Sequence, residues 1–492
     1  MNNTIARLLP NSAAVPMWAR AGIRMLEAQL QTASAIPLMD LAGLAAARLA
    51  LAIAPHAQRI VVMSGPGNNG GDGLEAALHL HRWGKSVQVH LLGNPKQRPA
   101  DARRALERAS QAGVPILTGL TPSVPILGSQ DLCIDALLGI GATRAPEAEL
   151  RHAIDWMNAS NARVLAIDIP TGLDADSGQP LGEPAAVVKA DDTLTLLGNK
   201  PGLFMGHGRD VCGTLWLDAL GLPPQATDWQ MPDATLNPPA VRATRMHASH
   251  KGSHGDVAVV GGETGMTGAA LLAATAALHG GAGRVMLTLL GQLPSAAPPD
   301  LMLRKLQNLD LPRLTVVAGC GGGRAVAEPL ARLLQYSARL VLDADALNRL
   351  AEDPWLQDLL TQRSMRQQAT VLTPHPLEAA RLLGCSTDQV QANRLGAATQ
   401  LAQRFACCVV LKGSGTVIAA PGHTPRINTT GNGLLATGGT GDVLAGLTGA
   451  RLAATGGAWQ AACDAVWTHG QVADDWPSGS ALTASRLADR LH

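Results

Sequence analysis

Short apolar runs rich in β-branched residues alternate with longer Ala- and Leu-rich segments of helical periodicity, and this alternation constrains the fold most. Continuous apolar strands separated by helices are typical of parallel sheets that are covered by helices on both faces. Each half of the chain is therefore predicted to be a three-layer α/β domain. The predicted strands lie at residues 59–65, 86–93, 131–139 and 163–170 in the first half, and at 255–262, 313–319, 338–344, 369–374 and 408–413 in the second.

A proline-rich stretch divides the two halves. With 492 residues, the chain has room for two α/β domains of about 250 residues each. The prolines in this stretch have few apolar periodic positions between them, which is typical of a semi-rigid linker. The prediction is a first domain at 1–222, a linker at 223–239 and a second domain at 240–492.

Composition excludes several classes of function. The 39 Lys and Arg residues balance 38 Asp and Glu residues, so no overall field attracts nucleic acid or an anionic membrane. Aromatic residues make up 2% of the chain, too few for a base-stacking platform. No apolar run reaches 18 residues, the first twenty residues do not read as a signal peptide, and the seven cysteines form no CxxC motif. We therefore expect a cytoplasmic protein with reduced, mostly buried thiols and with neither nucleic acid nor membrane as a partner.

In the first half, the residues just after the strands carry the chemistry, because ligands of such sheets bind beyond the carboxyl ends of the strands. The stretch Gly65–Gly73 contains GxGxxG and leads into a helix, which suits an anion. The next strand ends at Gly93 and Asn94 without the acidic residue that a dinucleotide fingerprint needs, so a hydride-transfer enzyme is not predicted. The alternative is a tight turn with Asp72 as the helix cap.

Two aspartates, Asp135 and Asp168, lie near the ends of predicted apolar strands. A carboxylate there costs several kcal/mol unless it is paired, hydrogen-bonded or bound to a metal. Oxygen atoms of Asn69, Asp135 and Thr171 could converge on a hard cation. One such aspartate is compatible with a structural role, whereas two at strand ends favour a site.

Residues 13–222 resemble the N-terminal domain of the NAD(P)H-hydrate epimerases. The motifs that carry this resemblance are GPGNNGGDG, DALLGIGATR, DIPTGLDADSG and VKADDTLTLLGNKPGL, with IRMLEAQL and LMDLAG before them. The resemblance implies a potassium ion at Asn69, Asp135 and Thr171, where Thr171 replaces the usual Ser, and a catalytic Asp168. It implies that the hydrated dinucleotide is bound by Asn68, Asn69, Gly70, Gly71, Asp72, Gly139, Ile140, Gly141, Ala142, Thr143, Arg144, Ala145 and Asp168.

In the second half, Gly438–Asp442 reads GGTGD at the start of a predicted helix. Its backbone N–H groups can stabilise a transferring phosphate, and Asp442 lies where a carboxylate could accept the proton of the attacking hydroxyl. The alternative is that Asp442 merely caps the helix. Three further segments fit one nucleotide site, although each alone is weak, and a His in a proline turn is often only a surface residue. They are Gly319–Gly323, Thr373–Glu378 with His375, and Lys412–Thr416.

Residues 240–492 resemble the ADP-dependent NAD(P)H-hydrate dehydratases, whose fold is ribokinase-like. The motifs that carry this resemblance are GGTGD, TPHPLE, VLKGSGT, LVLDADALN and KGSHGDVAVVGG. Leu377 replaces the usual Gly after TPHP, and GCGGG replaces the commoner GPGLG. Neither departure removes a charged or nucleophilic group. The resemblance implies ADP and Mg²⁺ as cofactors. The residues it assigns to the adenylate are Lys412, Gly413, Ser414, Gly415, Thr416 and Gly441, and those facing the hydrated nicotinamide are Ala269, Gly322, His375 and Asp442.

Together the two resemblances imply one repair pathway. The first half equilibrates R and S hydrates of NADH and NADPH, and the second dehydrates the S form while ADP becomes AMP and phosphate, in an expected homo-oligomer. Two alternatives stay open. The second half could be a kinase of vitamin precursors such as hydroxymethylpyrimidine or hydroxyethylthiazole, and the first half could be a non-catalytic binding module.

Overall fold

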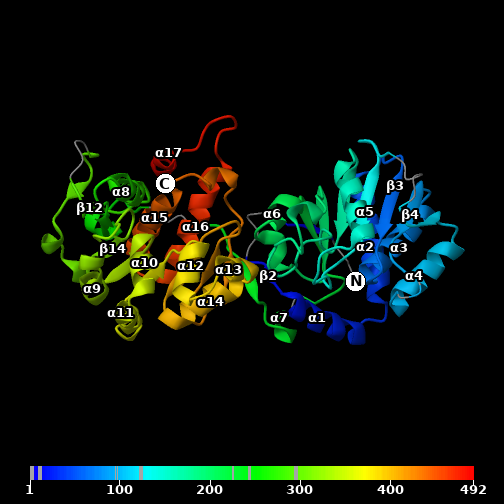
Figure 1. Cartoon of the computed structure of the whole chain (residues 1–492), viewed down its shortest axis with the longest axis horizontal. Helices are drawn as coiled ribbons and strands as arrows, with labels where there is room; N and C mark the ends of the chain where they lie inside the picture. The colour runs from blue at the N-terminus through cyan, green and yellow to red at the C-terminus, as the bar shows by residue number, and fades with distance from the viewer. Residues whose placement is uncertain are drawn as a thin grey trace. The chain divides into compact units, whose positions relative to one another are not determined.

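The computed structural model describes residues 5–8, 14–94, 96, 98–120, 126–223, 226–241, 245–292 and 297–491. The chain forms two compact units, built mainly from Pro16–Ala234 and Thr235–His492 (Figure 1). The predicted linker at 223–239 spans this division. It is not structureless, because it contains the helix α7 (Ala226–Trp229) and the strand β10 (Ala234–Leu236).

The first unit contains an eight-stranded sheet in the order β1-β9-β8-β7-β6-β3-β4-β5. Strands β3 to β9 pair in parallel, and β1 pairs with β9 in the antiparallel sense. The chain winds outward from β3 in both directions, so the topological switch point lies between β3 and β6. The strands are β1 (Ala6–Arg7), β3 (Ile60–Ser64), β4 (Val87–Leu91), β5 (Ile116–Thr118), β6 (Leu132–Ala136), β7 (Arg163–Ile167), β8 (Asp192–Leu196) and β9 (Thr214–Asp218); the short β2 is Pro16–Met17.

Helices cover both faces of this sheet. One face packs against α2, α3 and α4, and the other packs against α5, each with its own buried apolar cluster. The strand pattern predicted this three-layer arrangement, and the parallel, doubly wound order of the sheet makes the unit Rossmann-like. The helices are α1 (Arg20–Ala33), α2 (Leu38–Ile53), α3 (Asn68–Arg82), α4 (Ala100–Gln111), α5 (Ala148–Ala159) and α6 (Gly208–Val211).

The second unit has a larger sheet, which runs β13-β12-β11-β14-β15-β16-β17-β18-β19-β10. The strands from β13 to β17 are parallel, and the switch point lies between β11 and β14. The strands are β11 (Asp256–Gly261), β12 (Arg284–Leu289), β13 (Met302–Leu303), β14 (Thr315–Ala318), β15 (Arg339–Leu342), β16 (Thr370–Leu372), β17 (Cys408–Leu411), β18 (Val417–Ala419) and β19 (Arg426–Ile427).

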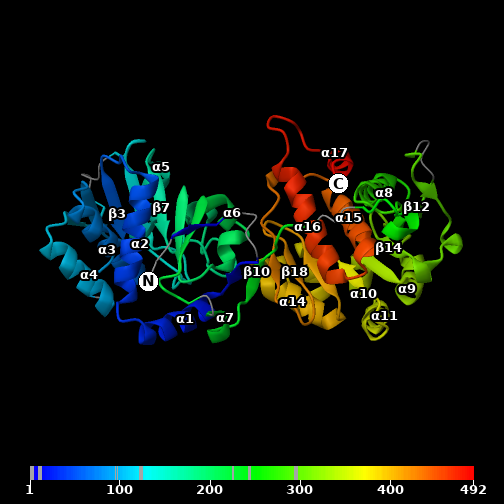
Figure 2. The ribbon, with the colours of Figure 1, turned by 180° about the vertical axis from the view of Figure 1, so that it is seen from behind.

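One face of the second sheet packs against α8, α15 and α16, and α14 packs against β17 and β18 (Figure 2). Helices α8 and α15 approach closely at Gly446, where a Cβ atom would lie 2.0 Å from the Ala273 carbonyl oxygen. The helices are α8 (Thr267–His279), α9 (Ala327–Tyr336), α10 (Asp345–Glu352), α11 (Pro354–Met365), α12 (Pro376–Leu383), α13 (Thr387–Ala392), α14 (Arg394–Phe405), α15 (Thr440–Thr455), α16 (Ala458–Asp474) and α17 (Ala484–Asp489).

All nine predicted strands are present within about three residues of their predicted limits. The predicted parallel pairing holds for most strands but not for β1 and β18. Strand β18 pairs with both β17 and β19 in the antiparallel sense, because a short turn joins each pair and no crossover helix intervenes. Six of the seven cysteines are buried and all seven are free thiols, as predicted.

Within the described residues, no single helix is long and apolar enough to cross a membrane. Helices α1 and α2 reach such a length and composition only when taken together, and they are bent by 107°.

A buried glutamate makes the stability of the first unit depend on pH. Glu75 in α3 has no exposed surface, and Arg108 of α4 lies 3.1 Å from its Oε1 without hydrogen-bond geometry. Burial, with Arg108 opposing it, raises the pKa of Glu75 from 4.5 to about 6. The folded state therefore binds the proton more tightly than the unfolded chain, so stability falls as the pH rises through this window.

Between pH 4.5 and pH 7.5, the unfolding free energy of the wild type should fall by about 2 kcal/mol more than that of Glu75→Gln. Gln keeps the volume of the side chain and removes the buried charge. Urea unfolding at both pH values, followed by circular dichroism, measures the difference between variant and wild type. Equal pH dependence in the two proteins would show that another group is responsible.

Candidate active sites

The first candidate site lies at the switch point between β3 and β6. Gly65 directly follows β3, and a Cβ atom there would lie 1.8 Å from the carbonyl oxygen of Leu137, just beyond β6. Gly70 is equally confined, since its Cβ would lie 2.0 Å from the Gly65 carbonyl oxygen. These two glycines let the start of α3 lie against the ends of both strands, which is where ligands of such sheets bind.

Asp135, in β6, forms the buried centre of this site and has no exposed surface. Its Oδ1 accepts hydrogen bonds from the Thr171 hydroxyl (2.7 Å) and the Leu137 amide (3.1 Å), and its Oδ2 accepts one from the Thr171 amide (2.8 Å). The Thr171 hydroxyl also accepts from the Leu138 amide at 2.9 Å. Burial raises the pKa of Asp135 to about 6, although these hydrogen bonds lower it.

Asp168, directly after β7, forms an ion pair that the sequence pattern did not reveal. Its backbone φ is +70°, a left-handed conformation that is rare outside glycine and is typical of functional sites. Oδ1 lies 2.5 Å from Nζ of the fully buried Lys200, and Oδ2 accepts a hydrogen bond from the Ile140 amide at 2.9 Å. Lys200 also donates to the Thr195 hydroxyl (3.0 Å) and to the Leu196 carbonyl (2.7 Å).

Asn69 is 7% exposed, and neither atom of its side-chain amide has a hydrogen-bond partner within the described residues. Its neighbour is Gly139, where a Cβ atom would lie 3.0 Å from Asp168 Oδ2 and 3.2 Å from Asn69 Cγ. A buried amide without a partner is unfavourable in water-free surroundings, so it fits a ligand or an ion. Residues 137–140 thus bring Asn69, Asp168 and the Asp135–Thr171 pair to one edge of the sheet.

Residues 68–72 form the first turn of α3, whose N-cap is Gly67. Asp72 is therefore not the cap of the helix. Burial, together with the negative charges of Asp168 and Glu27, raises the pKa of Asp72 well above its usual value. Glu27 of α1 has a raised pKa for the same two reasons, burial and then Asp168. The positive charge of Lys200 opposes the increase in both pKa values.

The segment Gly139–Ala145 leaves the sheet beside Asp168 and becomes exposed from Gly141 onward, except for the half-buried Ala142. Arg20, the first residue of α1, holds this segment in place. Its guanidinium donates to the carbonyl oxygens of Ile140 (2.7 Å) and Ala142 (3.0 Å) and pairs with Asp174 at 2.7 Å. Sequence reasoning missed Arg20, which lies more than 100 residues before the segment that it anchors.

The second candidate site lies at the carboxyl ends of β14 to β17. Asp343, just after β15, is 1% exposed and has two strong partners. Its Oδ1 accepts from Lys412 Nζ (2.6 Å) and from the Thr373 hydroxyl (2.7 Å), which follow β17 and β16 respectively. Asp343 belongs to the quoted motif LVLDADALN but was not among the predicted site residues; its position at a strand end was the available signal.

Asp442 is in the first turn of α15, whose N-cap is Gly439 in the left-handed conformation. The side chain makes no capping hydrogen bond, which excludes the helix-cap alternative. Burial and the nearby charge of Asp343 raise the pKa of Asp442 to about 6, against the effects of Cys320 and Lys412. A carboxyl group whose pKa lies near neutral pH can accept and return a proton, and this one lies at the start of a helix whose first turn contains glycine.

His375 is the N-cap of α12. Its Nδ1 accepts hydrogen bonds from the amides of Leu377 (3.1 Å) and Glu378 (3.3 Å), while Nε2 lies 3.2 Å from Glu378 Oε1. Burial, then the charge of Lys412, lowers the pKa of His375. Burial raises the pKa of Glu378, which lies 3.9 Å from Lys412, to about 7. The imidazole therefore shapes the turn through Nδ1, and its Nε2 lies beside the Glu378 carboxyl group.

The glycine loop after β14 is packed on its own neighbours. Gly322 donates its amide to the Gly319 carbonyl at 2.9 Å, and the Gly323 amide donates to Asp345 at 2.8 Å. A Cβ atom on Gly321 would lie 2.9 Å from that of Ala269 in α8, which places Ala269 beside this loop. The structure thus brings together Ala269 and the glycine loop, as predicted, and the amide of Gly322 is already in use.

Lys412 and the loop that follows it have different surroundings. The Lys412 ammonium points to Asp343 and also lies 3.4 Å from where Gly441 would carry a Cβ atom, beside the start of α15. The rest of the loop, Gly413–Thr416, is held from behind by the buried Arg394. Its guanidinium donates to the carbonyl oxygens of Leu411, Lys412 and Gly415 at 3.2–3.3 Å.

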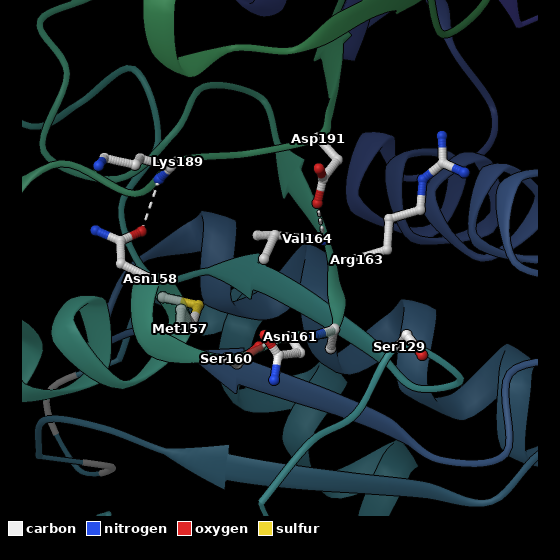
Figure 3. Close-up of a pocket in the computed structure, with 10 residues that line it drawn as sticks. Ser129, Met157, Asn158, Ser160, Asn161, Arg163, Val164, Lys189 and Asp191 are labelled. Carbon is white, nitrogen blue, oxygen red and sulfur yellow. Dashed lines mark hydrogen bonds between the residues drawn. The ribbon is translucent and has the colours of Figure 1, made fainter.

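A polar cavity of about 580 Å³ in the first unit lies apart from both sites. It opens at the amino-terminal end of β7, the edge of the sheet opposite Asp135 and Asp168 (Figure 3). Asn158 accepts a hydrogen bond from the Lys189 amide, and Asp191 accepts one from the Val164 amide, both at 2.8 Å. The carboxylate of Asp191 and the side-chain amide of Asn158 thus accept hydrogen bonds from the backbone, and we assign this cavity to neither of the two sites.

Comparison with known proteins assigns each half to a family. The family model described as NAD(P)H-hydrate dehydratase matches residues 257–492, and the model described as YjeF-related protein N-terminus matches residues 35–202.

Similar proteins match nearly the whole chain. A protein of Escherichia coli named bifunctional NAD(P)H-hydrate repair enzyme is 36% identical over 451 residues, covering 87% of this chain and 84% of its own length. A protein of the same name from Coxiella burnetii is 36% identical over 416 residues and covers 82% of each chain. A solved structure, titled an ADP/ATP-dependent NAD(P)H-hydrate dehydratase from Bacillus subtilis co-crystallised with ATP and Mg²⁺, is 28% identical. It covers 51% of this chain and 92% of its own, with a TM-score of 0.42.

Proposed function

The chain belongs to the bifunctional NAD(P)H-hydrate repair enzymes, and from this membership we propose which residues perform each of its two reactions. The first half is the epimerase, an isomerase, and the second half is the dehydratase, a lyase. The vitamin-precursor kinase alternative is not favoured, because the relatives that match both halves are named repair enzymes.

In the dehydratase half, the substrate is the S hydrate of NADH or NADPH and the phosphate donor is ADP. The hydrate hydroxyl attacks the terminal phosphorus of ADP, the bond to AMP breaks, and the hydroxyl proton passes to Asp442. The carbon–oxygen bond then breaks with phosphate as the leaving group, and loss of a proton from the adjacent carbon restores the ring double bond. Phosphorylation thus replaces hydroxide, a poor leaving group, by phosphate.

One observation carries this assignment: among the described residues Asp442, at the head of α15, forms no ion pair, whereas its neighbour Asp343 is paired with Lys412. Lys412 places a positive charge beside Gly441 and the helix start, where the transferring phosphate is proposed to bind. Mg²⁺ bound to the phosphates would neutralise their charge. The loop Gly413–Thr416, held by Arg394, is the proposed adenylate site, and Ala269, Gly322 and His375 are proposed to face the nicotinamide.

The nucleotide requirement can be tested with purified S hydrate. Full-length enzyme is mixed with Mg²⁺ and ADP, ATP or no nucleotide, and NAD(P)H absorbance is followed. We expect turnover with ADP, stoichiometric formation of AMP and phosphate, and no turnover without nucleotide or after chelation of Mg²⁺. Rapid dehydration without nucleotide would contradict the proposed phosphorylation step.

In the epimerase half, we propose that Asp168 contacts the hydrated nicotinamide, with Asn68–Asp72 and Gly139–Ala145 around the rest of the dinucleotide. Lys200 supports this role, because its ammonium pairs with the buried Asp168 carboxylate and holds it in place. The partnerless amide of Asn69, which is within reach of Gly139, supports a ligand at this edge of the sheet.

Potassium fits the same edge. The oxygen donors are of the hard type that such an ion prefers, and Asn69 Oδ1 has no hydrogen-bond partner in the part of the chain that the structure describes. Asp135 and Thr171 are already joined by two hydrogen bonds, so they would offer one preformed pair of oxygens. When bound, the ion would supply positive charge beside Asp135.

We also propose homo-oligomeric assembly and a cytoplasmic location.

We expect KCl to raise the thermal midpoint of the wild type above its value in equimolar tetramethylammonium chloride. Asp135→Asn should abolish this difference, because it removes the charge that compensates the ion. Asp101→Asn, an exposed carboxylate in α4, is the matched control and should behave as the wild type. A potassium effect that survives in Asp135→Asn would place the ion elsewhere.

A further inference from the structure

Two loops of the epimerase site are joined at their base, close to the ends of their strands. The β6 loop (137–147) follows β6, and the β7 loop (168–183) follows β7. The Leu138 amide donates to the Thr171 hydroxyl, and the Ile140 amide donates to Asp168 Oδ2, both at 2.9 Å. Farther from the sheet, within the described residues, no hydrogen bond joins the two loops directly.

Arg20 joins the same two loops at their outer end. Its Nε donates to the Ile140 carbonyl oxygen at 2.7 Å, and its Nη2 donates to the Ala142 carbonyl oxygen at 3.0 Å, both in the β6 loop. Nη2 also donates to Asp174 Oδ2 at 2.7 Å, and the Arg20 backbone amide donates to Asp176 Oδ1 at 2.6 Å, both in the β7 loop. One residue of α1 thus bridges the two loops.

The partner of Arg20 in the β7 loop is itself held in place. Asp174 Oδ1 accepts hydrogen bonds from the Ser177 amide (2.8 Å), the Ser177 hydroxyl (2.7 Å) and the Asp176 amide (3.2 Å). The side chains of Arg20 and Asp174 are 18% and 20% exposed, so salt screens this pair less than a pair on the surface. Asp174 therefore gives Arg20 a fixed point from which to hold the β6 loop.

We propose that Arg20 is a positioning residue of the epimerase: by tying Gly139–Ala145 to the turn at Asp174, it holds the backbone of that segment in the conformation that binds the hydrated dinucleotide. The inference rests on the proposed binding of the dinucleotide by Gly139–Ala145. A segment that is ordered beforehand loses less conformational freedom when its ligand binds, so Arg20 should act on substrate affinity. Because Arg20 makes no hydrogen bond to Asp168 or Lys200, the chemical step should be largely unaffected.

The test measures initial rates of conversion of pure S hydrate into R hydrate by the full-length enzyme, with the two separated by chromatography. Nucleotide is omitted so that no hydrate is consumed by dehydration. We expect Arg20→Met to raise KM roughly 5- to 20-fold while kcat stays within about twofold of the wild type. Arg20→Lys keeps the charge but lacks the planar fork, so its KM should lie between the two.

Arg59→Met is the matched control. Arg59 also pairs with an aspartate, Asp131, at 2.7 Å and donates to a backbone carbonyl, that of Ile126, at 3.1 Å. It directly precedes β3, at the opposite edge of the sheet from the site. If the effect of Arg20→Met comes from the β6 loop and not from a general loss of stability, Arg59→Met should keep the wild-type KM.

Hydrogen exchange gives a readout that does not depend on activity. Without ligand, peptides that cover 139–145 should exchange faster in Arg20→Met than in the wild type, and peptides from α3 should not. An unchanged KM, unchanged exchange in 139–145, or an equal rise in KM in Arg59→Met would overturn the inference alone. A wild type that does not interconvert the hydrates would overturn the proposed epimerase function and, with it, this inference.

Discussion

Asp442→Asn should lower nucleotide-dependent dehydration of the S hydrate roughly 10²–10⁴-fold, the usual effect of removing a positioned general base. Asn preserves the shape of the side chain but cannot accept the proton. Its neighbours Asp343 and Lys412 are paired with each other, so the fold of the second half should survive. Epimerisation should be unaffected, because Asp442 lies in the unit that does not contain the epimerase residues.

The measurement is the rate of NAD(P)H formation from pure S hydrate with ADP and Mg²⁺, next to an epimerisation assay without nucleotide. Asp358→Asn, an exposed carboxylate in α11, is the matched control and should retain full activity. Near wild-type dehydration by Asp442→Asn would show that another group accepts the proton.

Asp168→Asn should lower epimerisation at least 100-fold while leaving dehydration of pure S hydrate intact. The substitution removes the carboxylate that touches the Ile140 amide and Lys200, and with it the proposed contact to the nicotinamide. Given a mixture of R and S hydrates with ADP, the variant should stop once the S fraction is consumed, apart from slow spontaneous epimerisation.

Breaking a buried ion pair by removing one partner costs roughly 3–5 kcal/mol, so the single variant is compared with Asp168→Asn/Lys200→Gln, which leaves no unpaired charge. Both should stop at the S fraction, and Asp155→Asn, exposed on α5, should run as the wild type. Complete conversion by a folded Asp168 variant would show that this carboxylate is dispensable.

The sequence was sufficient to place residues that directly follow strands. Asp168 and Lys412 could be found because apolar runs end visibly, and parallel strands bring their carboxyl ends to one edge. The GGTGD turn was found by its motif at the start of a predicted helix. The pattern also predicted two domains. The predicted strands did not include β8, β9 and β12, nor shorter strands such as β5 and β19.

Contacts between distant segments could not be predicted in the same way. Lys200 reaches Asp168 from the segment after β8, and Asp343 pairs with Lys412 from 69 residues away. Such pairs depend on strand order and on the direction of single side chains, which neither periodicity nor motif spacing encodes. His375 shows a different restriction. The motif drew attention to this residue, but the hydrogen bonds by which its Nδ1 caps α12 are seen only in the structure.

The most direct test of the central claim, that one chain both interconverts and dehydrates the hydrates, is a single progress curve. A mixture of R and S hydrates is incubated with wild-type enzyme, ADP, Mg²⁺ and K⁺, and NAD(P)H absorbance is followed to its end point against the total hydrate supplied. The account predicts conversion of all the hydrate, R and S alike. A curve that stops at the S fraction, even after more enzyme is added, would contradict it and would make the first half a non-catalytic module.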